Sequence, residues 1–138
     1  MRRVFADTAY WVAILNKKDS LHGLAKNVSQ QRTGDILVTT EMVLTEFANF
    51  FCERGAFFRK SAGELIQEIR NDPNIEIELQ TTSLFQRGLA EYLRYEDKQW
   101  SLTDCASISV MRNRGLVEVL TDDHHFEQAG FTILLKRK

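Results

Sequence analysis

The sequence has little of what defines several specialised classes of protein. Only two cysteines, Cys52 and Cys105, occur among 138 residues, which excludes a disulfide scaffold and a cysteine-rich zinc site and makes a reducing compartment the default. Proline occurs once, at Pro73, and there is no glycine- or serine-rich tract, so nothing marks a linker. A chain of this length fits one domain and leaves no room for two. We expect a single domain over residues 1–138.

Long apolar runs and an excess of one charge are also missing. No segment approaches the roughly 20 apolar residues that cross a bilayer, and the basic start reaches Asp7 too early to hold a signal-peptide core. Eighteen lysines and arginines stand against nineteen aspartates and glutamates, a formal net charge of −1. This balance excludes a strongly basic coat for nucleic acid, so any such contact must come from a local patch. We expect a cytoplasmic protein without membrane contact.

Short β-branched runs alternate along the chain with longer segments of helical periodicity. Strands separated by helices predict a central, mostly parallel sheet covered on both faces, which is a three-layer α/β/α sandwich. Residues 75–79 alternate apolar and acidic side chains, which predicts a strand with one solvent-facing side at an edge of the sheet. Strands are predicted at about residues 4–6, 36–39, 75–79, 117–120 and 131–135, and helices at about residues 9–16, 19–31, 40–54, 59–71, 83–95, 101–113 and 126–129. Asp19 or Ser20 is the expected cap of the second helix, and Gly55 the expected stop of the third.

Acidic residues follow the ends of the predicted strands, where open parallel sheets bind ligands. Asp7 follows the first strand, Asp122 and Asp123 follow the fourth, and Asp104 lies at the front of a helix. Taken alone, each of these acids is better explained as a helix cap, and Asp104 fits a capping box with Ser101.

Glu46 is harder to explain as a cap, because it lies inside a predicted helix among apolar residues. We expect that apolar stripe to face the core, where a carboxylate is costly to bury unless something neutralises it. One alternative is a buried salt bridge to Arg2, Arg3 or Arg112, and the other is a role as metal ligand. The stripe consists of Met42, Val43, Phe47 and Phe50.

A shared function of these acids requires that their side chains meet in one cavity. Like charges roughly 4 Å apart repel by several kcal/mol at intermediate dielectric, so such a cluster needs bound protons or a cation. Oxygen ligands select Mg²⁺ or Mn²⁺ rather than zinc. Mg²⁺ keeps several waters, one of which can act as the nucleophile, and two such ions can bracket a phosphodiester.

The acids also lie in four short segments that follow one another in a characteristic order along the chain. Val-Phe-Ala-Asp-Thr at residues 4–8 is followed by Thr-Glu-Phe at 45–47, Ser-Leu-Thr-Asp-Cys-Ala-Ser at 101–107 and Leu-Thr-Asp-Asp-His-His-Phe at 120–126. This order resembles the PIN-domain ribonucleases, specifically the VapC-type toxins of toxin–antitoxin pairs. Residues 19–25 are similar to the Asp-x-x-His-x-x-Ala signature of that family. The match covers nearly the whole chain; its motifs are unspecific singly and fairly specific together.

The resemblance implies a PIN-like fold and a role for individual residues. The pattern Thr-x-Asp-x-x-Phe selects Asp123 and leaves Asp122 as a ligand of an outer-sphere water. Thr8 and Thr121 would be hydroxyls that orient carboxylates or waters. The implied quartet of catalytic and metal-binding acids is Asp7, Glu46, Asp104 and Asp123.

The resemblance further implies an endoribonuclease that depends on Mg²⁺ or Mn²⁺ and cleaves single-stranded RNA by attack of water on phosphorus. A homodimer and a small antitoxin protein are the implied partners. Two alternatives stay open: a structure-specific DNA nuclease, and a non-catalytic PIN-like binding module whose acids are only caps. DNA nucleases of this kind usually carry long helical insertions, for which the chain has no space. The Gly-x-Gly-x-x-Gly fingerprint of dinucleotide-binding domains is missing.

Other polar and aromatic residues receive structural interpretations. His124 and His125 lack a third nitrogen or sulfur ligand at suitable spacing, which argues against zinc, and we expect His125 to be a structural residue of its loop. The aromatic residues, Phe50 among them, are expected in the core or an interface rather than as base-stacking platforms, and residues 136–138 as a solubilising end. The candidate phosphate contacts are Lys17, Lys18, Arg54, Arg59, Lys60, Arg112 and Arg114.

Overall fold

A computed structural model describes residues 1–137, so Lys138, the last residue of the expected solubilising end, lies outside the described part. The strands are β1 (Arg3–Ala6), β2 (Ile36–Thr40), β3 (Ile75–Glu78), β4 (Glu118–Leu120) and β5 (Thr132–Ile133). The helices are α1 (Thr8–Leu15), α2 (His22–Gln31), α3 (Glu41–Phe51), α4 (Ala56–Asn71), α5 (Thr82–Arg94), α6 (Leu102–Arg114) and α7 (His124–Gln128).

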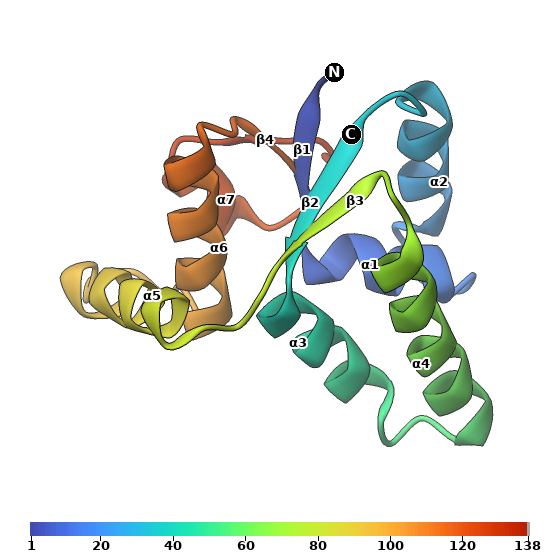
Figure 1. Cartoon of the computed structure of the whole chain (residues 1–138). Helices are drawn as coiled ribbons and strands as arrows, with labels where there is room; N and C mark the ends of the chain where they lie inside the picture. Colours follow the sequence, from blue (N-terminus) through green and yellow to red (C-terminus); the bar gives the residue numbers. More distant parts are fainter. Residues whose placement is uncertain (138) are drawn as a thin grey trace.

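All five strands belong to one sheet, in the order β3-β2-β1-β4-β5, and every pairing is parallel. Figure 1 shows α5, α6 and α7 on one side of the sheet and α1, α2 and α4 on the other. The predicted three-layer α/β/α architecture is therefore confirmed, with a sheet that is parallel throughout.

The central strands are short and apolar because helices cover both of their faces. Val4, Phe5 and Ala6 of β1 are fully buried, as is Val38 of β2. Their side chains join those of α1, α3 and α6 in one apolar core. Within residues 1–137, none of the helices combines the length and apolar character needed to cross a bilayer.

The strand order reverses between β1 and β4, and this reversal positions the site. The chain runs outward from β1 through β2 to β3, then returns to place β4 on the other side of β1. Ala6 is the register partner of Leu120, so the residues that follow, Asp7 and Thr121, leave the sheet side by side. A crevice at the carboxyl ends of strands, where the order reverses, is the usual ligand site of such sheets.

The acidic edge strand β3 lies at the predicted position, and the glutamates on its partly exposed side have arginine partners. Arg3 Nη2 lies 3.0 Å from Glu76 Oε2, and Arg114 contacts Glu76 at 2.7 Å and Glu78 at 2.8 Å. Two guanidinium groups therefore neutralise the carboxylates of this strand.

Two predicted helix boundaries were wrong. Helix α3 ends at Phe51, and Gly55, with φ of 95°, serves as the N-cap of α4 instead of ending a helix at Arg54. Helix α2 begins at His22, because the Asp19 carboxylate accepts a hydrogen bond from the Leu21 amide within the preceding turn.

Candidate active site

An open cavity of about 700 Å³ lies at the carboxyl ends of β1 and β4. It contains every acid that the sequence analysis selected, contributed by segments far apart in the chain. The selected residues in its lining are Asp7, Thr8, Glu46, Asp104, Asp122 and Asp123. Thr121, the remaining selected residue, is fully buried beside Asp7. The arrangement brings the predicted residues together, and their catalytic roles stay a prediction.

Asp7 is the most deeply placed of these acids, with 5% of its surface exposed. Although it occupies the N-cap position of α1, its side chain makes no capping hydrogen bond, so the capping explanation fails here. Its Oδ2 instead accepts a hydrogen bond of 2.9 Å from the Thr121 hydroxyl. Burial raises the pKa of Asp7 to about 7, and the charges of Asp104 and Glu46 add to this rise. The Thr8 backbone and, to a smaller extent, the Thr121 hydroxyl oppose it.

Asp104 caps a helix and faces the cavity at the same time. Its backbone amide donates to Ser101 Oγ at 3.0 Å, and its Oδ2 accepts from the Ser101 amide at 3.1 Å, which completes the predicted capping box. Burial, followed by the negative charge of Asp123, raises the pKa of Asp104. The Asp104 side chain uses Oδ2 for its hydrogen bond within the box, so capping does not compete with a ligand in the cavity for Oδ1.

Glu46 is exposed, which corrects the expectation that it is buried in the core. Val43 and Phe47 are fully buried, whereas Glu46 lies on the neighbouring side of α3 and lines the open cavity. The apolar face of α3 is narrower than the sequence spacing suggested, because the helix packs beside a cavity. The salt-bridge alternative is also wrong, since Arg2, Arg3 and Arg112 pair with Asp35, Glu76 and Glu91.

The two adjacent aspartates after β4 have different partners. Asp123 caps α7 by accepting a hydrogen bond of 2.9 Å from the His125 amide. Asp122 lies 3.6 Å from Arg137, whose guanidinium also donates to Ser20 Oγ at 2.7 Å. An arginine thus partly neutralises Asp122, which favours Asp123 as the fourth acid. Arg137 is held against the cavity wall and is more than a solubilising residue.

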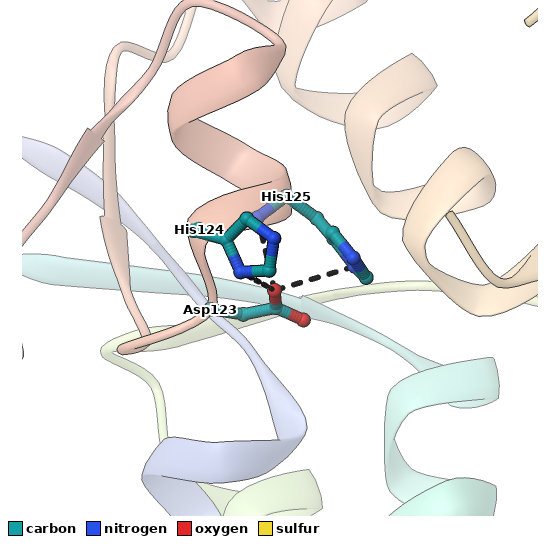
Figure 2. Close-up of side chains that lie close together, drawn as sticks. All are labelled: Asp123, His124 and His125. Carbon is teal, nitrogen blue, oxygen red and sulfur yellow. Dashed lines mark hydrogen bonds and ion pairs between the residues drawn. The ribbon is translucent and has the colours of Figure 1, made fainter. Parts of the chain in front are cut away.

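His125 is the site residue that the sequence analysis missed. Its Nδ1 lies 3.2 Å from Asp104 Oδ2 and 3.3 Å from Asp123 Oδ1, and Figure 2 shows its ring and that of His124 beside the Asp123 carboxylate. The expectation of a purely local structural role was wrong, because His125 joins two acids that are 19 residues apart in sequence. A contact of this kind leaves no local signal in the sequence.

A second set of ligand atoms overlaps this cluster. Atoms of Asp123, His124 and His125 lie within 4.8 Å of one another, close enough to hold a metal ion. The His124 side chain is 70% exposed, and its Nδ1 is 3.8 Å from Asp123 Oδ1. Two imidazoles and one carboxylate suit softer ions than the carboxylate quartet does. Asp123 belongs to both sets.

The carboxylate quartet fits a hard divalent cation. Among residues 1–137, no lysine or arginine forms an ion pair with Asp7, Glu46, Asp104 or Asp123, so the fold leaves their charge largely uncompensated. The Thr8 hydroxyl beside them is buried without a hydrogen-bond partner. An uncompensated, oxygen-rich set of this kind suits Mg²⁺ or Mn²⁺.

Comparison of the sequence with known proteins finds a related endonuclease but no matching family model. No protein-family model matches the chain. The chain is 28% identical over 131 residues to the 23S rRNA-specific endonuclease VapC20 of Mycobacterium tuberculosis, an alignment that covers 93% of this chain and 95% of that protein.

The structural comparisons agree with the sequence comparison. The crystal structure of VapC20, described as a toxin that cleaves the sarcin-ricin loop, superimposes with a TM-score of 0.83 and 26% identity over 94% of this chain and 96% of VapC20. FitAcB from Neisseria gonorrhoeae shares the fold, with a TM-score of 0.65, 12% identity, and coverage of 95% of this chain and 96% of that one. In both sequence and fold, the chain is therefore similar to VapC20, and this similarity supports the resemblance to VapC-type PIN-domain proteins.

Proposed function

We propose that this protein is a metal-dependent endoribonuclease that cleaves single-stranded RNA by attack of water on a phosphodiester. The observation that carries the proposal is the meeting of Asp7, Glu46, Asp104 and Asp123 in one cavity without a lysine or arginine partner among the described residues. Similarity to VapC20, which is named as an rRNA endonuclease, supports RNA as the substrate.

The four carboxylates would hold Mg²⁺ or Mn²⁺. When bound, such an ion supplies positive charge for the phosphodiester oxygens and makes a water molecule more acidic. The chain itself orients the ligands. The Thr121 hydroxyl fixes the Asp7 carboxylate through Oδ2, and the His125 ring lies between Asp104 and Asp123. Partners that orient metal ligands in this way typically contribute about 10- to 100-fold to affinity or activity.

The proposal extends to the partners of the protein. As VapC20 is described as a toxin, we propose that this chain is the toxin of a toxin–antitoxin pair, inhibited by a small antitoxin protein, and that it forms a homodimer. Light scattering of the purified protein tests the dimer. A short neighbouring reading frame whose product blocks cleavage tests the antitoxin.

A time course with purified protein tests the central activity. The substrates are an unstructured single-stranded RNA, a hairpin from the large ribosomal RNA, and single-stranded and duplex DNA of matched sequence. We expect cleavage of RNA with Mg²⁺ or Mn²⁺ and none in EDTA.

The other outcomes separate the alternatives. Equal cleavage in EDTA refutes metal dependence, and preferential cleavage of DNA identifies a DNA nuclease. Absence of cleavage, together with no shift of the melting temperature on addition of Mg²⁺ or Mn²⁺, indicates a non-catalytic binding module.

A further inference from the structure

Among the candidate phosphate contacts, Arg54 differs from those that form ion pairs. Lys60, Arg112 and Arg114 form ion pairs with glutamates. Within residues 1–137, Arg54 pairs with no carboxylate; its Nε donates to the Phe50 carbonyl at 2.8 Å. The backbone therefore holds this guanidinium in place while leaving its charge available to an anion.

The Arg54 guanidinium also lies over the Phe50 ring, 4.1 Å from its centroid. Phe50 is 39% exposed and lines the same cavity as the acids. The fully buried Phe51 packs edge-on against it, with ring centroids 4.9 Å apart. The ring is thus braced from the core side, stacked with a cation, and open to the cavity.

Position along α3 relates this pair to the acids. Phe50 follows Glu46 by four residues, so the two side chains lie on the same helix face, about 6 Å apart along the helix axis. Arg54 follows four residues later. Although Arg54 lies in the turn after α3, its guanidinium is over the Phe50 ring. A carboxylate, an aromatic ring and a guanidinium therefore follow one another along this segment. Proteins that bind single-stranded nucleic acid combine these last two groups, with rings for bases and cations for phosphates.

We propose that Phe50 and Arg54 form a subsite for one nucleotide of the substrate RNA, next to the phosphodiester that is cleaved. The base stacks on the Phe50 ring, and the adjoining phosphate contacts the Arg54 guanidinium. This inference rests on the proposed function and assigns Phe50 the base-stacking role that the sequence analysis did not expect.

Binding of a short, fluorescently labelled single-stranded RNA tests the subsite. Fluorescence anisotropy is measured with Mg²⁺ in an Asp104→Asn background, which prevents cleavage during the measurement. Phe50→Leu keeps apolar volume but removes the aromatic face, and we expect binding about 5- to 100-fold weaker. Phe50→Trp is expected to retain binding. Arg54→Ala is expected to weaken binding and to lower the dependence of log K on log salt by about 0.7.

RNAs with a single abasic nucleotide identify the stacked base. At one position, the missing base should weaken binding to the parent protein as much as Phe50→Leu weakens binding of the intact RNA. Combining that abasic RNA with Phe50→Leu should weaken binding no further, since both changes remove the same contact. Full additivity at every position overturns the proposal.

Phe57→Leu is the matched control. Phe57 is an exposed aromatic on α4, at 76% exposure, and is not part of the cavity lining, so RNA binding should not change. Melting temperatures show that each variant is folded. If folded Phe50→Leu binds RNA within twofold of the parent protein, the subsite is overturned. It is also overturned if Phe50→Leu loses dimer formation or antitoxin binding while RNA binding is unchanged.

The subsite and the proposed function fail in different ways. RNA binding that depends on Phe50, without cleavage by the unmodified chain, supports the subsite and refutes the ribonuclease. Metal-dependent cleavage with a dissociation constant unaffected by Phe50→Leu supports the ribonuclease and refutes the subsite.

Discussion

Two groups of carboxylates in this protein show opposite electrostatic behaviour. On the edge strand β3, hydrogen bonds from Arg3 and Arg114 lower the pKa of Glu76 to about 2. In the cavity, burial and neighbouring acids raise the pKa of Asp7 to about 7. Two arginines pair with the first group, whereas no lysine or arginine of residues 1–137 pairs with Asp7, Glu46, Asp104 or Asp123. Strong perturbation without a built-in counter-charge, in a cleft, is typical of functional sites.

Removing one charge from each group gives the largest expected contrast. Asp104→Asn keeps an oxygen that can accept from Ser101 but removes a carboxylate from the quartet. We expect RNA cleavage to fall by more than about 100-fold, beyond the range for residues that only orient ligands, with an unchanged or higher melting temperature in EDTA because repulsion is reduced. Glu76→Gln is the matched control and should cleave normally. Full activity of purified Asp104→Asn counts decisively against the proposed function.

Substitution of His125 is expected to have the next largest effect, because this side chain contacts two of the acids. His125→Ala removes contacts of 3.2 and 3.3 Å to Asp104 and Asp123, and we expect about 10- to 100-fold slower cleavage. His125→Asn, whose amide nitrogen can replace Nδ1, should recover part of the rate. His124→Ala, at the more exposed ring, is the control. Equal effects of His125→Ala and His124→Ala refute the positioning role.

Opposite pKa shifts predict opposite dependences of stability on pH in the metal-free protein. The pKa of Asp7 is about 7 in the folded protein, against an ordinary value of 3.8. Its contribution to stability is therefore full below pH 3.8 and is lost as the pH rises from 3.8 to about 7. Glu76, shifted from 4.5 to about 2, contributes above pH 4.5 and loses its contribution as the pH falls toward 2.

Melting temperatures measured in EDTA from pH 3 to 8 separate these two contributions. Asp7→Asn should flatten the loss between about pH 4 and 7, and Glu76→Gln should flatten the acid limb. The same slope above pH 4 in Asp7→Asn and in the unmodified chain contradicts the raised pKa of Asp7.

The smallest expected effect is the loss of stability when an ion pair on the edge strand β3 is removed. Glu76 is partly exposed, and solvent-exposed ion pairs contribute about 0.2–1 kcal/mol each. Glu76→Gln should therefore lower the free energy of unfolding in urea at pH 7 by about 1 kcal/mol or less, and 1 M NaCl should reduce the difference. A loss several times larger would mean that β3 is held mainly by these pairs.

Features encoded locally were predictable from the sequence. Short apolar strands alternate with helices, which predicted the parallel fold. Asp7 and Asp123 follow predicted strands, which made a shared cavity conceivable, whereas the full acidic set, with Asp104 at the front of a helix, came from the family resemblance. The capping box at Ser101 was also predictable, because its two residues are only three positions apart. Neither prediction needed knowledge of distant contacts.

Features that depend on packing were not predictable. The exposure of Glu46 depends on how α3 lies beside the cavity, and its helical periodicity does not contain that information. The contact of His125 with Asp104 and that of Arg137 with Asp122 depend on where α7 and the C-terminal segment pack. The end of α3 at Phe51, which leaves Arg54 in the turn before α4, was likewise beyond the reach of local signals.

The hydrogen bond from Thr121 to Asp7 joins residues 114 positions apart. A chain emerging from the ribosome therefore presents Asp7 long before Thr121 and Asp123 are synthesised. Until β4 adds alongside β1, the nascent protein holds only part of its acidic cluster. The topology thus makes completion of the acidic cluster depend on the addition of β4, the fourth strand along the chain, to the edge of β1.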